Sequence, residues 1–379
     1  MNGSIRKKNN HSWELTIDLG RDENGKRKRK YVHVTGNKSD AQKRLREILT
    51  DHDKGLPIDI PKITVRAYLD KWLDDYAKIR TAPRTVDGYS GIIERYLKPH
   101  LGRILLSELT PHHIQGLYSK MSEQGLSAQT ILHTHKLLSQ TLRQAIKWQL
   151  LVRNVCEAVD PPRARRKQMS ALDTADVQVF LEAIKGSPYM HLFYVMLYTG
   201  LRRGETLGLR WCDVDLAKET ISVNQNVVRL HNNGLSVREP KTPYSRRLIS
   251  LSPSVVTLLK GLRVRQMEQL EANNQEWSET GFVFANNDGG PLSPDTVTHA
   301  FTKIIKRTGL PHVRLHDLRH THATLMLKQG VHPKIVSERL GHSSVTITMD
   351  TYSHVLPGMQ EQAAMAFEEA VQGSVKEFV

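Results

Sequence analysis

The side chains with the clearest chemical potential lie near the C-terminal end, where cations, imidazoles and a phenol follow one another. His316 and Arg319 are three positions apart, His342 closes a Leu-Gly-His turn, and Tyr352 follows soon after it. Residues three apart on a helix share one face, so His316 and Arg319 can meet the same group. A Thr-Gly-Leu-Arg motif far upstream adds Arg202. Together these groups could bind a phosphodiester and attack it without a metal ion.

A phosphodiester resists attack because it is anionic and because its leaving alkoxide is poor. Arginine can bind it well, since the planar guanidinium matches two phosphate oxygens and stays charged. Nearby cations and a histidine base would favour deprotonation of a phenol whose ordinary pKa is ~10. A metal site would instead need clustered carboxylates. The best candidates, Asp213 and Asp215, lie beside Trp211 in a short turn, so we interpret them as loop hydrogen-bond acceptors and predict no metal and no cofactor.

The composition favours a nucleic-acid partner. The chain has 379 residues, with 54 Lys and Arg against 39 Asp and Glu, a formal net charge of +15. This excess is typical of nucleic-acid-binding proteins, although a merely basic soluble protein is the alternative. Cys156 and Cys212 are the two cysteines, which excludes a disulfide scaffold and a cysteine-rich zinc site. With no signal peptide and no apolar run of ~20 residues, we expect a cytoplasmic protein that does not contact membranes.

Two proline-containing linkers divide the chain into three predicted domains, at residues 1–55, 62–160 and 170–379. Prolines interrupt helices, and the basic run that follows the prolines of the second linker cannot bury itself. We therefore expect a multidomain protein that is mainly α-helical, with small β-sheets in its first and third domains.

The first domain is predicted to be a small sheet backed by one helix. Apolar and polar residues alternate over 13–19 and again over 29–34, and Ser39 or Asp40 can cap the helix that follows. Basic residues at the start of the second strand could enter a major groove of DNA. The alternative is a charge run that protects an edge strand. These basic residues are Arg27, Lys28, Arg29 and Lys30.

The second domain is predicted to be all helix, because apolar residues recur at helical spacing. We expect helices near 65–76, 85–96, 111–124 and 127–149. Their aromatic and apolar stripes are interpreted as core. Basic residues on the helix exteriors and in the following linker could line a DNA duplex, although such exteriors are also basic for solubility alone. The candidates are Arg84, Lys136, Arg165 and Arg166.

The third domain is predicted to mix helices with one small antiparallel sheet. A buried helix over 191–198 would deliver Arg202, and Asp173 would cap an earlier helix. The expected strands are 220–229, 235–241 and 246–251. Helices return from Ser293 onward, and an amphipathic tail helix over 357–379 could dock on a neighbouring protomer.

The motifs of the third domain resemble the tyrosine recombinase family, and the chain resembles integrases of phages and conjugative transposons. The motifs are Thr-Gly-Leu-Arg-Arg-Gly-Glu at 199–205, Lys-Thr-x-x-Ser-x-Arg at 241–247, His-x-x-Arg at 316–319, Leu-Gly-His at 340–342 and Asp-Thr-Tyr at 350–352. The match is specific in the third domain and weaker in the first two. The resemblance implies an arm-type DNA-binding domain, a helical core-binding domain and a mixed α+β catalytic domain of the tyrosine recombinase type.

The resemblance also implies roles for the reactive residues. Tyr352 would attack the scissile phosphate and hold the 3′ end of DNA as a phosphotyrosine. Arg202 and Arg319 would bind the non-bridging phosphate oxygens, and Lys241 would protonate the leaving oxygen. Arg203 adjoins Arg202 but lies outside the register of the motif.

Three further residues would support this reaction. His316 would assist proton transfer at the tyrosine, His342 would hydrogen-bond the phosphate, and Glu205 would brace the site. His320 and His322 follow the His-x-x-Arg motif but are not expected to be catalytic.

The function implied is that of a site-specific DNA recombinase, an integrase that inserts and excises a phage or mobile element without ATP. It would act as a homo-tetramer on core and arm attachment sites, and as a monomer when free. An excisionase and a DNA-bending host protein are candidate partners, and the location would be the bacterial cytoplasm, at the nucleoid. The alternatives are a type IB topoisomerase-like enzyme that relaxes DNA and a non-catalytic DNA-binding regulator on the same fold.

Overall fold

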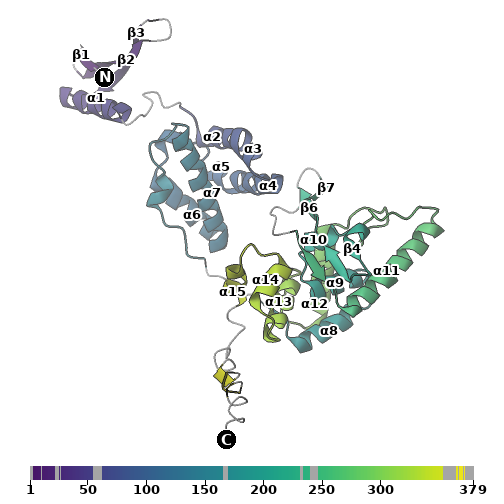
Figure 1. The fold of residues 1–379 in the computed structure, drawn as a ribbon. Helices are drawn as coiled ribbons and strands as arrows, with labels where there is room; N and C mark the ends of the chain where they lie inside the picture. Colours follow the sequence, from purple (N-terminus) through teal and green to yellow (C-terminus); the bar gives the residue numbers. More distant parts are fainter. Residues whose placement is uncertain are drawn as a thin grey trace. The chain divides into compact units, whose positions relative to one another are not determined.

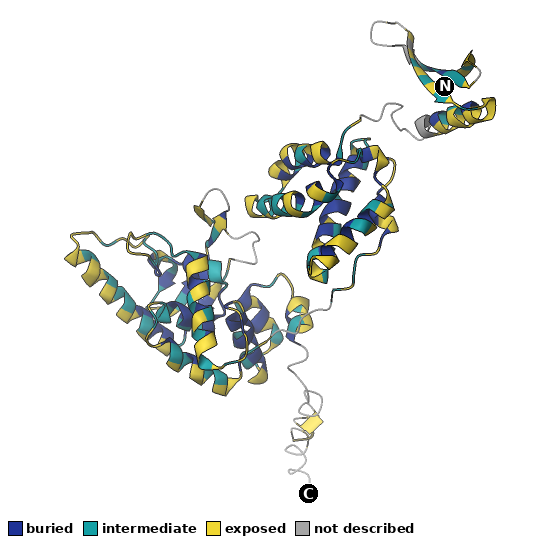
Figure 2. Ribbon diagram, turned by 180° about the vertical axis from the view of Figure 1, so that it is seen from behind, coloured by how far each residue is buried: buried dark blue, intermediate teal, exposed yellow. Residues whose placement is uncertain are grey.

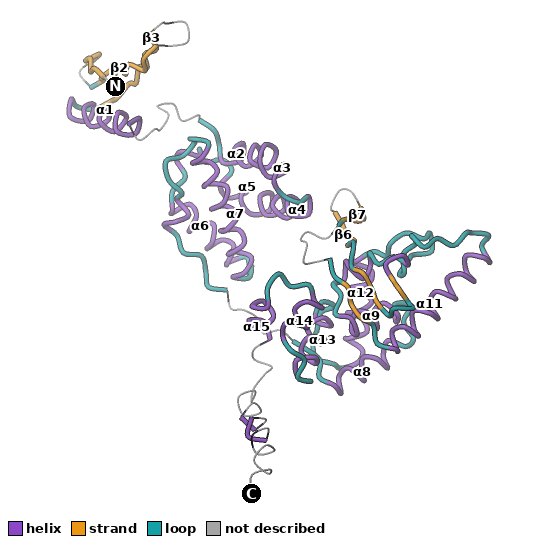
Figure 3. The backbone as a smooth tube through the Cα atoms, in the orientation of Figure 1, coloured by secondary structure: helices purple, strands orange, loops and turns teal. Residues whose placement is uncertain are grey.

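The computed structural model describes residues 3–9, 11–21, 25, 27–53, 62–164, 170–230, 234–239, 246–352, 364–365, 367–369 and 371. The chain divides into two compact units, Met1–Arg166 and Lys167–Val379, whose elements are labelled in Figure 1. Helices predominate, with small antiparallel sheets, as predicted (Figure 3). No helix within these described ranges has the length and apolar character needed to span a membrane. The division into three domains stays a prediction.

A three-stranded antiparallel sheet backed by one helix forms the N-terminal part. The strand order is β1-β2-β3, and the bounds are β1 Gly3–Asn9, β2 Ser12–Arg21, β3 Arg27–Thr35 and α1 Lys38–Asp53. Leu15 and Ile17 of β2 pack with Ala41 and Ile48 of α1 in one apolar cluster. The alternation along β2 thus gives one buried face, because successive side chains of a strand point to opposite sides.

Two details of this part differ from the sequence prediction. β1 was not expected, because its sequence, Gly-Ser-Ile-Arg-Lys-Lys-Asn, lacks alternating apolar residues. The cap of α1 is Asn37 rather than Ser39 or Asp40 itself. The Asn37 side chain accepts from the Asp40 backbone and the Asp40 carboxylate accepts from the Asn37 backbone, both at 2.9 Å. This reciprocal pair satisfies two backbone N–H groups at the helix start.

The following segment is helical, and two of its expected helices continue through π-helical turns. The bounds are α2 Val65–Trp72, η1 Leu73–Ala77, α3 Lys78–Arg80, α4 Pro83–Ile92, η2 Ile93–Leu97, α5 Lys98–Leu101, η3 Leu106–Glu108, α6 Pro111–Glu123, α7 Ala128–Lys147 and η4 Val155–Ala158. The apolar stripes form one core that includes Tyr68, Trp72 and Leu138. Figure 2 shows buried residues on the faces that these helices turn toward one another. The stripes are therefore core, as interpreted from the sequence.

The second unit surrounds a larger apolar core with helices. Its bounds are α8 Thr174–Ile184, α9 Met190–Thr199, α10 Arg203–Leu207, η5 Trp211–Asp213, β4 Val214–Asp215, β5 Thr220–Ser222, β6 Asn226–Leu230, β7 Gly234–Arg238, β8 Leu248–Ser250, α11 Pro253–Ala272, α12 Pro294–Thr308, α13 Asp317–Lys328, α14 Pro333–Leu340 and α15 Val345–Tyr352. Phe180, Phe193 and Phe301 pack together from α8, α9 and α12, with ring centroids 5.6 to 6.5 Å apart. This packing fixes α9, which leads into the first arginine motif.

The prediction of a single sheet in this unit is wrong, because its strands form two separate sheets. β5 pairs with β4 and β8, whereas β6 and β7 form a separate hairpin. The strand expected over 220–229 is interrupted where Asn224 and Gln225 bond elsewhere. Asn224 Nδ2 donates to Asp213 at 2.8 Å, and Gln225 Nε2 donates to the Gly208 carbonyl at 2.5 Å. These side-chain bonds draw the backbone away from the first sheet.

Some predicted features lie outside the described residues. They include Lys241 and most of the tail over 357–379. In the tail, Met365 and Phe367 are helical and exposed. Docking of the tail on a neighbouring protomer stays a prediction.

Candidate active site

The first arginine of the site lies where α9 gives way to α10. α9 ends at Gly200, whose φ of 68° is in the left-handed region. A Cβ atom there would lie 2.8 Å from side-chain atoms of His322 and Leu340. Glycine therefore suits this turn for its backbone angle and for its close packing. The turn places Arg202 so that its Nη2 donates to the Gly341 carbonyl at 3.1 Å.

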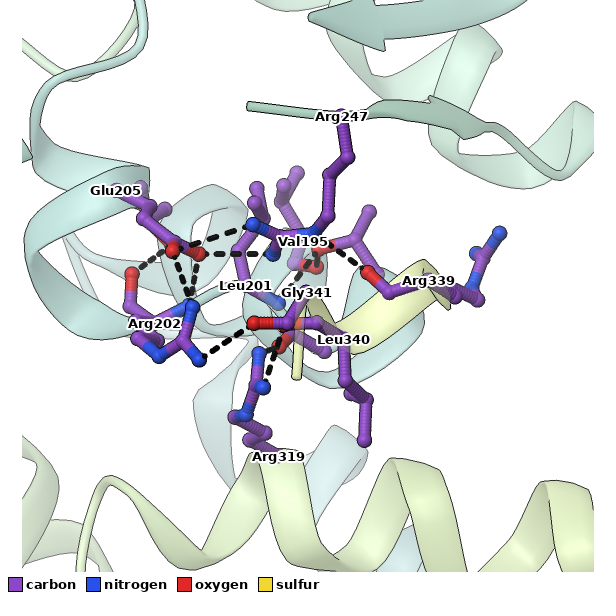
Figure 4. Close-up of polar contacts among 12 residues, drawn as sticks. Val195, Leu201, Arg202, Glu205, Arg247, Arg319, Arg339, Leu340 and Gly341 are labelled. Atoms are coloured by element: carbon purple, nitrogen blue, oxygen red, sulfur yellow. Dashed lines mark hydrogen bonds and ion pairs between the residues drawn. The ribbon is translucent and has the colours of Figure 1, made fainter. Parts of the chain in front are cut away.

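Glu205 holds the Arg202 side chain in place. Its Oε1 accepts from Arg202 Nη1 at 2.7 Å, and its Oε2 accepts from the Arg202 backbone N–H at 2.9 Å. Arg247 reaches the same carboxylate from another direction, as Figure 4 shows, at 3.2 and 2.9 Å. Burial alone would raise the pKa of Glu205, but hydrogen bonding and charge from Arg247, then the charge of Arg202, lower it to about 2. The carboxylate is therefore ionised at neutral pH and pairs with two guanidinium groups.

Arg319 approaches from α13 and is almost fully buried. Its Nη1 donates to the Gly200 carbonyl at 2.8 Å and its Nη2 to the Leu340 carbonyl at 2.6 Å. Arg202 binds the next carbonyl, that of Gly341, so both guanidinium groups meet the C-terminal end of α14 (Figure 4). Desolvation, then the charge of Arg202, lower the pKa of Arg319 to about 9. Arg319 nevertheless remains cationic at neutral pH.

Arg203 points away from this cluster. Its Nη1 donates to the Pro294 carbonyl at 3.2 Å and to the Thr298 hydroxyl at 2.7 Å, both on α12. Of the two neighbouring arginines, it is therefore Arg202 that joins Arg319.

His342 follows a second left-handed turn. Gly341 has a φ of 66° and ends α14, and His342 Nδ1 lies 2.8 Å from the Thr348 hydroxyl. Desolvation, then the charges of Arg319 and Arg202, lower the pKa of His342 to about 4. The imidazole is therefore neutral near pH 7, when it can offer one N–H donor and one acceptor.

Tyr352 is the last residue of α15, and its side chain is buried with Leu327, Val336 and Leu340. Its hydroxyl oxygen lies 2.7 Å from Nδ1 of His320. Burial raises the pKa of Tyr352 to about 12, against the opposing effect of the Arg319 charge. The phenol is therefore protonated in this arrangement.

His316 precedes α13 as its N-cap residue, and its ring lies edge-to-face with that of His320, at 5.0 Å between centroids. The residue is exposed at the surface. Loss of water around the ring, then positive charge at His320 and Arg319, lower the pKa of His316. The structure thus gathers Arg202, His316, Arg319, His342 and Tyr352 into one cluster, braced by Glu205.

Two members of this cluster were missed by the sequence reasoning. His320 was discounted, although it lies four residues after His316 and therefore on the same helical face. Arg247 was noted within a motif but given no role. Its Nε donates to the Arg339 carbonyl at 2.6 Å, in addition to its pairing with Glu205. That contact could not be read from the sequence, because it joins residues 92 positions apart.

The carboxylates considered for a metal site make loop hydrogen bonds instead. Asp213 accepts from the Arg210 backbone at 3.2 Å, and Asp215 accepts from the Ala217 and Lys218 backbones at 3.1 and 2.8 Å. Across the part of the chain that the structure describes, no group of three or more His, Cys, Asp or Glu side chains is placed to hold a metal ion. That the reaction needs no metal stays a prediction.

Comparison with known proteins identifies the family. The Phage integrase family matches residues 170–358, and the N-terminal SAM-like domain of phage integrases matches residues 64–122. A tyrosine recombinase XerC-like protein of Caldanaerobacter subterraneus subsp. tengcongensis is 31% identical over 369 residues, covering 93% of this chain and 94% of the relative. The chain belongs to the phage integrase family of tyrosine recombinases. Its members are site-specific DNA recombinases, and this enzyme is one of them.

Other relatives and solved structures agree with this assignment. The ICEBs1 integrase of Bacillus subtilis is 28% identical, covering 76% of this chain and 78% of the relative. The Tn1549 transposon integrase, in complex with a circular intermediate DNA, matches with a TM-score of 0.68 at 21% identity, covering 81% of this chain and 99% of that chain. A lambda integrase dimer bound to a core site matches with a TM-score of 0.58 at 20% identity, over 92% and 94% of the two chains. These structural matches establish the fold of the recombinase.

The predicted DNA-binding residues of the recombinase differ in their placement. Arg27 and Arg29 are exposed on β3, and Arg29 pairs in register with Asp18 of β2. Lys30 instead pairs with the buried Ile17, so it lies on the face that α1 covers. Arg84 and Lys136 are exposed on α4 and α7. The side chain of Lys28, and the residues Arg165 and Arg166, lie outside what the structure describes.

Proposed function

We propose that Tyr352 is the nucleophile with which this recombinase cuts DNA. Its phenolic oxygen would bond to the scissile phosphorus, leaving the 3′ end of DNA as a phosphotyrosine and releasing a 5′-hydroxyl. The observation that supports this best is the convergence of Arg202 and Arg319 on the end of α14, next to His342 and the helix that ends at Tyr352. The covalent intermediate keeps the energy of the broken ester, so rejoining needs no ATP.

The arginines would stabilise the pentacoordinate phosphorus. Arginine can donate to two non-bridging oxygens at once, and fixed donors need no reorganisation as negative charge develops. His342, neutral near pH 7, would donate a further hydrogen bond to the phosphate. Lys241 would protonate the leaving 5′-oxygen, and His316 would assist proton transfer at Tyr352.

The other parts of the chain would choose the DNA. We propose that the N-terminal sheet binds arm sites through Arg27 and Arg29, and that the helical segment binds core sites with Arg84 and Lys136 on its exposed surface. Four copies would assemble on paired sites, and the protein would be a monomer when free. The lambda integrase supports this by analogy, since its structures show a dimer on a core site and a tetramer on a Holliday junction. An excisionase and a DNA-bending protein are further candidate partners, and the bacterial nucleoid is the expected place of action.

A nicked duplex tests the cutting reaction. The attachment site would be taken from the DNA that flanks the gene for this chain, with a nick placed just beyond the scissile phosphate. The short released strand diffuses away, so the covalent adduct accumulates. We expect adduct with the wild type, in buffer with or without chelator, and none with Tyr352→Phe. Adduct formation by Tyr352→Phe would remove this residue from the role, and loss of the wild-type adduct in chelator would contradict metal-free cutting.

The same purified protein and DNA also distinguish recombination from the two alternative functions. A type IB topoisomerase-like enzyme would relax supercoiled plasmid that lacks the attachment site, and a non-catalytic regulator would bind DNA without forming adduct. We expect recombination between two attachment sites and little relaxation of unrelated plasmid. The separate basic sheet at the N-terminus favours recombination, since relaxation of DNA does not require a second DNA-binding domain.

A further inference from the structure

The Tyr352 hydroxyl is buried against a histidine to which no role in the reaction has been given. Its oxygen lies 2.7 Å from His320 Nδ1, and the two rings are 5.7 Å apart. The exposed fractions of the two residues are 2% and 8%. Water therefore has little access to this hydrogen bond, and a proton leaving the phenol must first pass to the protein.

We propose that His320 accepts the proton of Tyr352 during DNA cleavage and returns it during rejoining. This inference rests on the proposed function of Tyr352 as the nucleophile. In the forward step, the Oη–H bond breaks and the proton moves to Nδ1 of His320, while Oη bonds to phosphorus. The bond from phosphorus to the 5′-oxygen breaks, and that oxygen takes a proton from Lys241. In the reverse step, the 5′-hydroxyl returns its proton to Lys241 as its oxygen bonds to phosphorus. The bond from phosphorus to Oη breaks, and His320 returns its proton to Oη.

The charges around His320 suit an acceptor that is neutral before the reaction. Desolvation lowers its pKa, Asp317 acts in the opposite direction, and Arg319 and Arg314 lower it further. Nδ1 can then accept, with the ring proton on Nε2. Because the pKa of Tyr352 is about 12, the transfer is completed only as the bond to phosphorus forms. The titratable and charged groups facing His320 are His316, Asp317, Arg314 and Arg319 around α13, His342 after α14, and Tyr352 on α15.

The position of His316 fits a supporting role in this scheme. Its ring packs edge-to-face on His320, at 5.0 Å between centroids, and the residue is exposed. It therefore lies between the buried pair and solvent. The Tyr352 oxygen, by contrast, is within hydrogen-bond distance of His320, which is the geometric requirement for a general base.

The test uses the full-length chain in single-turnover cleavage of the nicked attachment-site duplex. His320→Asn keeps an acceptor close to the position of Nδ1 but cannot take up a proton near pH 7, whereas His320→Ala removes both functions. His312→Asn, an exposed loop position of the same unit, is the matched control. Each variant is also measured for thermal stability and for DNA binding. A second substrate carries sulfur in place of the 5′-bridging oxygen, because a thiolate leaves without protonation.

We expect both His320 variants to cleave about 100-fold more slowly or worse, the lower end of general-base effects, with stability and DNA binding retained. The sulfur substrate should not restore their rates, but it should restore Lys241→Ala. A wild-type rate for His320→Asn would show that the histidine only positions the phenol. Faster cleavage by His320→Ala would show that the histidine only holds the phenol away from DNA. Either result overturns the proposal, as does rescue by sulfur. Absence of adduct with the wild type would overturn the nucleophile assignment as well, which keeps the two failures distinct.

Discussion

Arg247 and Glu205 form a two-point ion pair, in which the terminal nitrogens of the arginine lie 3.2 and 2.9 Å from the two carboxylate oxygens. Both side chains are 6% exposed. Arg247 immediately precedes β8, and Glu205 lies on α10. The pair therefore ties the small sheet to the turn that carries Arg202.

Glu205→Gln should destabilise the second unit strongly, because it leaves Arg247 buried without a compensating charge. Removing one partner of a buried pair costs about 3–5 kcal/mol. Urea unfolding followed by fluorescence would measure the loss. Glu182→Gln is the control, since Glu182 pairs with Lys185 at the surface, where such pairs contribute about 0–1 kcal/mol. Equal effects of the two substitutions would refute a special role for the buried pair.

Two glycines that end helices, Gly200 and Gly309, should respond differently to replacement by alanine. Gly200 and Gly309 both end helices with a φ of 68°, but only at Gly200 would a Cβ atom meet neighbours, His322 and Leu340, at 2.8 Å. Gly309→Ala should cost about 1–2 kcal/mol from backbone strain alone. Gly200→Ala should cost more and should also slow cleavage, because the carbonyl that Arg319 binds would shift. Calorimetry measures the loss of stability, and the adduct assay measures the rate of cleavage. Unchanged cleavage by Gly200→Ala would show that the turn does not position Arg319.

Stability should fall in mild acid through His322. Its Nε2 accepts from Arg339 Nε at 3.1 Å, and desolvation, then the charge of Arg339, lower its pKa to about 3. Below pH 6.5 the unfolded chain takes up a proton here and the folded chain does not, so folding loses about 1.4 kcal/mol per pH unit down toward pH 3. His322→Gln should flatten the dependence of the unfolding free energy on pH. A slope as steep as that of the wild type would exclude His322 as its source.

The exposed face of the N-terminal sheet predicts a salt-dependent contact with DNA. Arg29→Ala should weaken binding to arm-site DNA and reduce the slope of log affinity against log salt by about one unit. Arg44→Ala is the matched control on α1, where Arg44 pairs with Glu47 at the surface. Filter binding at several salt concentrations distinguishes the two. If Arg44→Ala weakened binding as much as Arg29→Ala, the sheet face would not be the contact.

The sequence predicted the larger helices and the chemical types in the site, because both depend on local patterns. Apolar periodicity defined α2 and α7, and the spaced motifs identified the residues of the cluster. Contacts between distant segments escaped it. The division of the sheet at Asn224 and the pairing of Arg247 with Glu205 depend on partners that only folding brings near. His320 was missed for another reason: its position four residues after His316 puts both on one helical face, but only the folded chain shows that it meets Tyr352.

The carbonyls at the end of α14 accept hydrogen bonds from both Arg202 and Arg319, so the folded chain itself holds these two side chains in place. The entropy of ordering these long side chains is therefore lost during folding, and a correctly matched DNA need not supply it. The ordered arginines would bind the phosphate of a mismatched DNA equally well. Discrimination between sequences must then reside in a step that precedes chemistry, namely the docking of DNA against the buried pair of Tyr352 and His320. If Tyr352 is the nucleophile, the fidelity of the enzyme depends on which DNA reaches Tyr352, and the two arginines do not contribute to that choice.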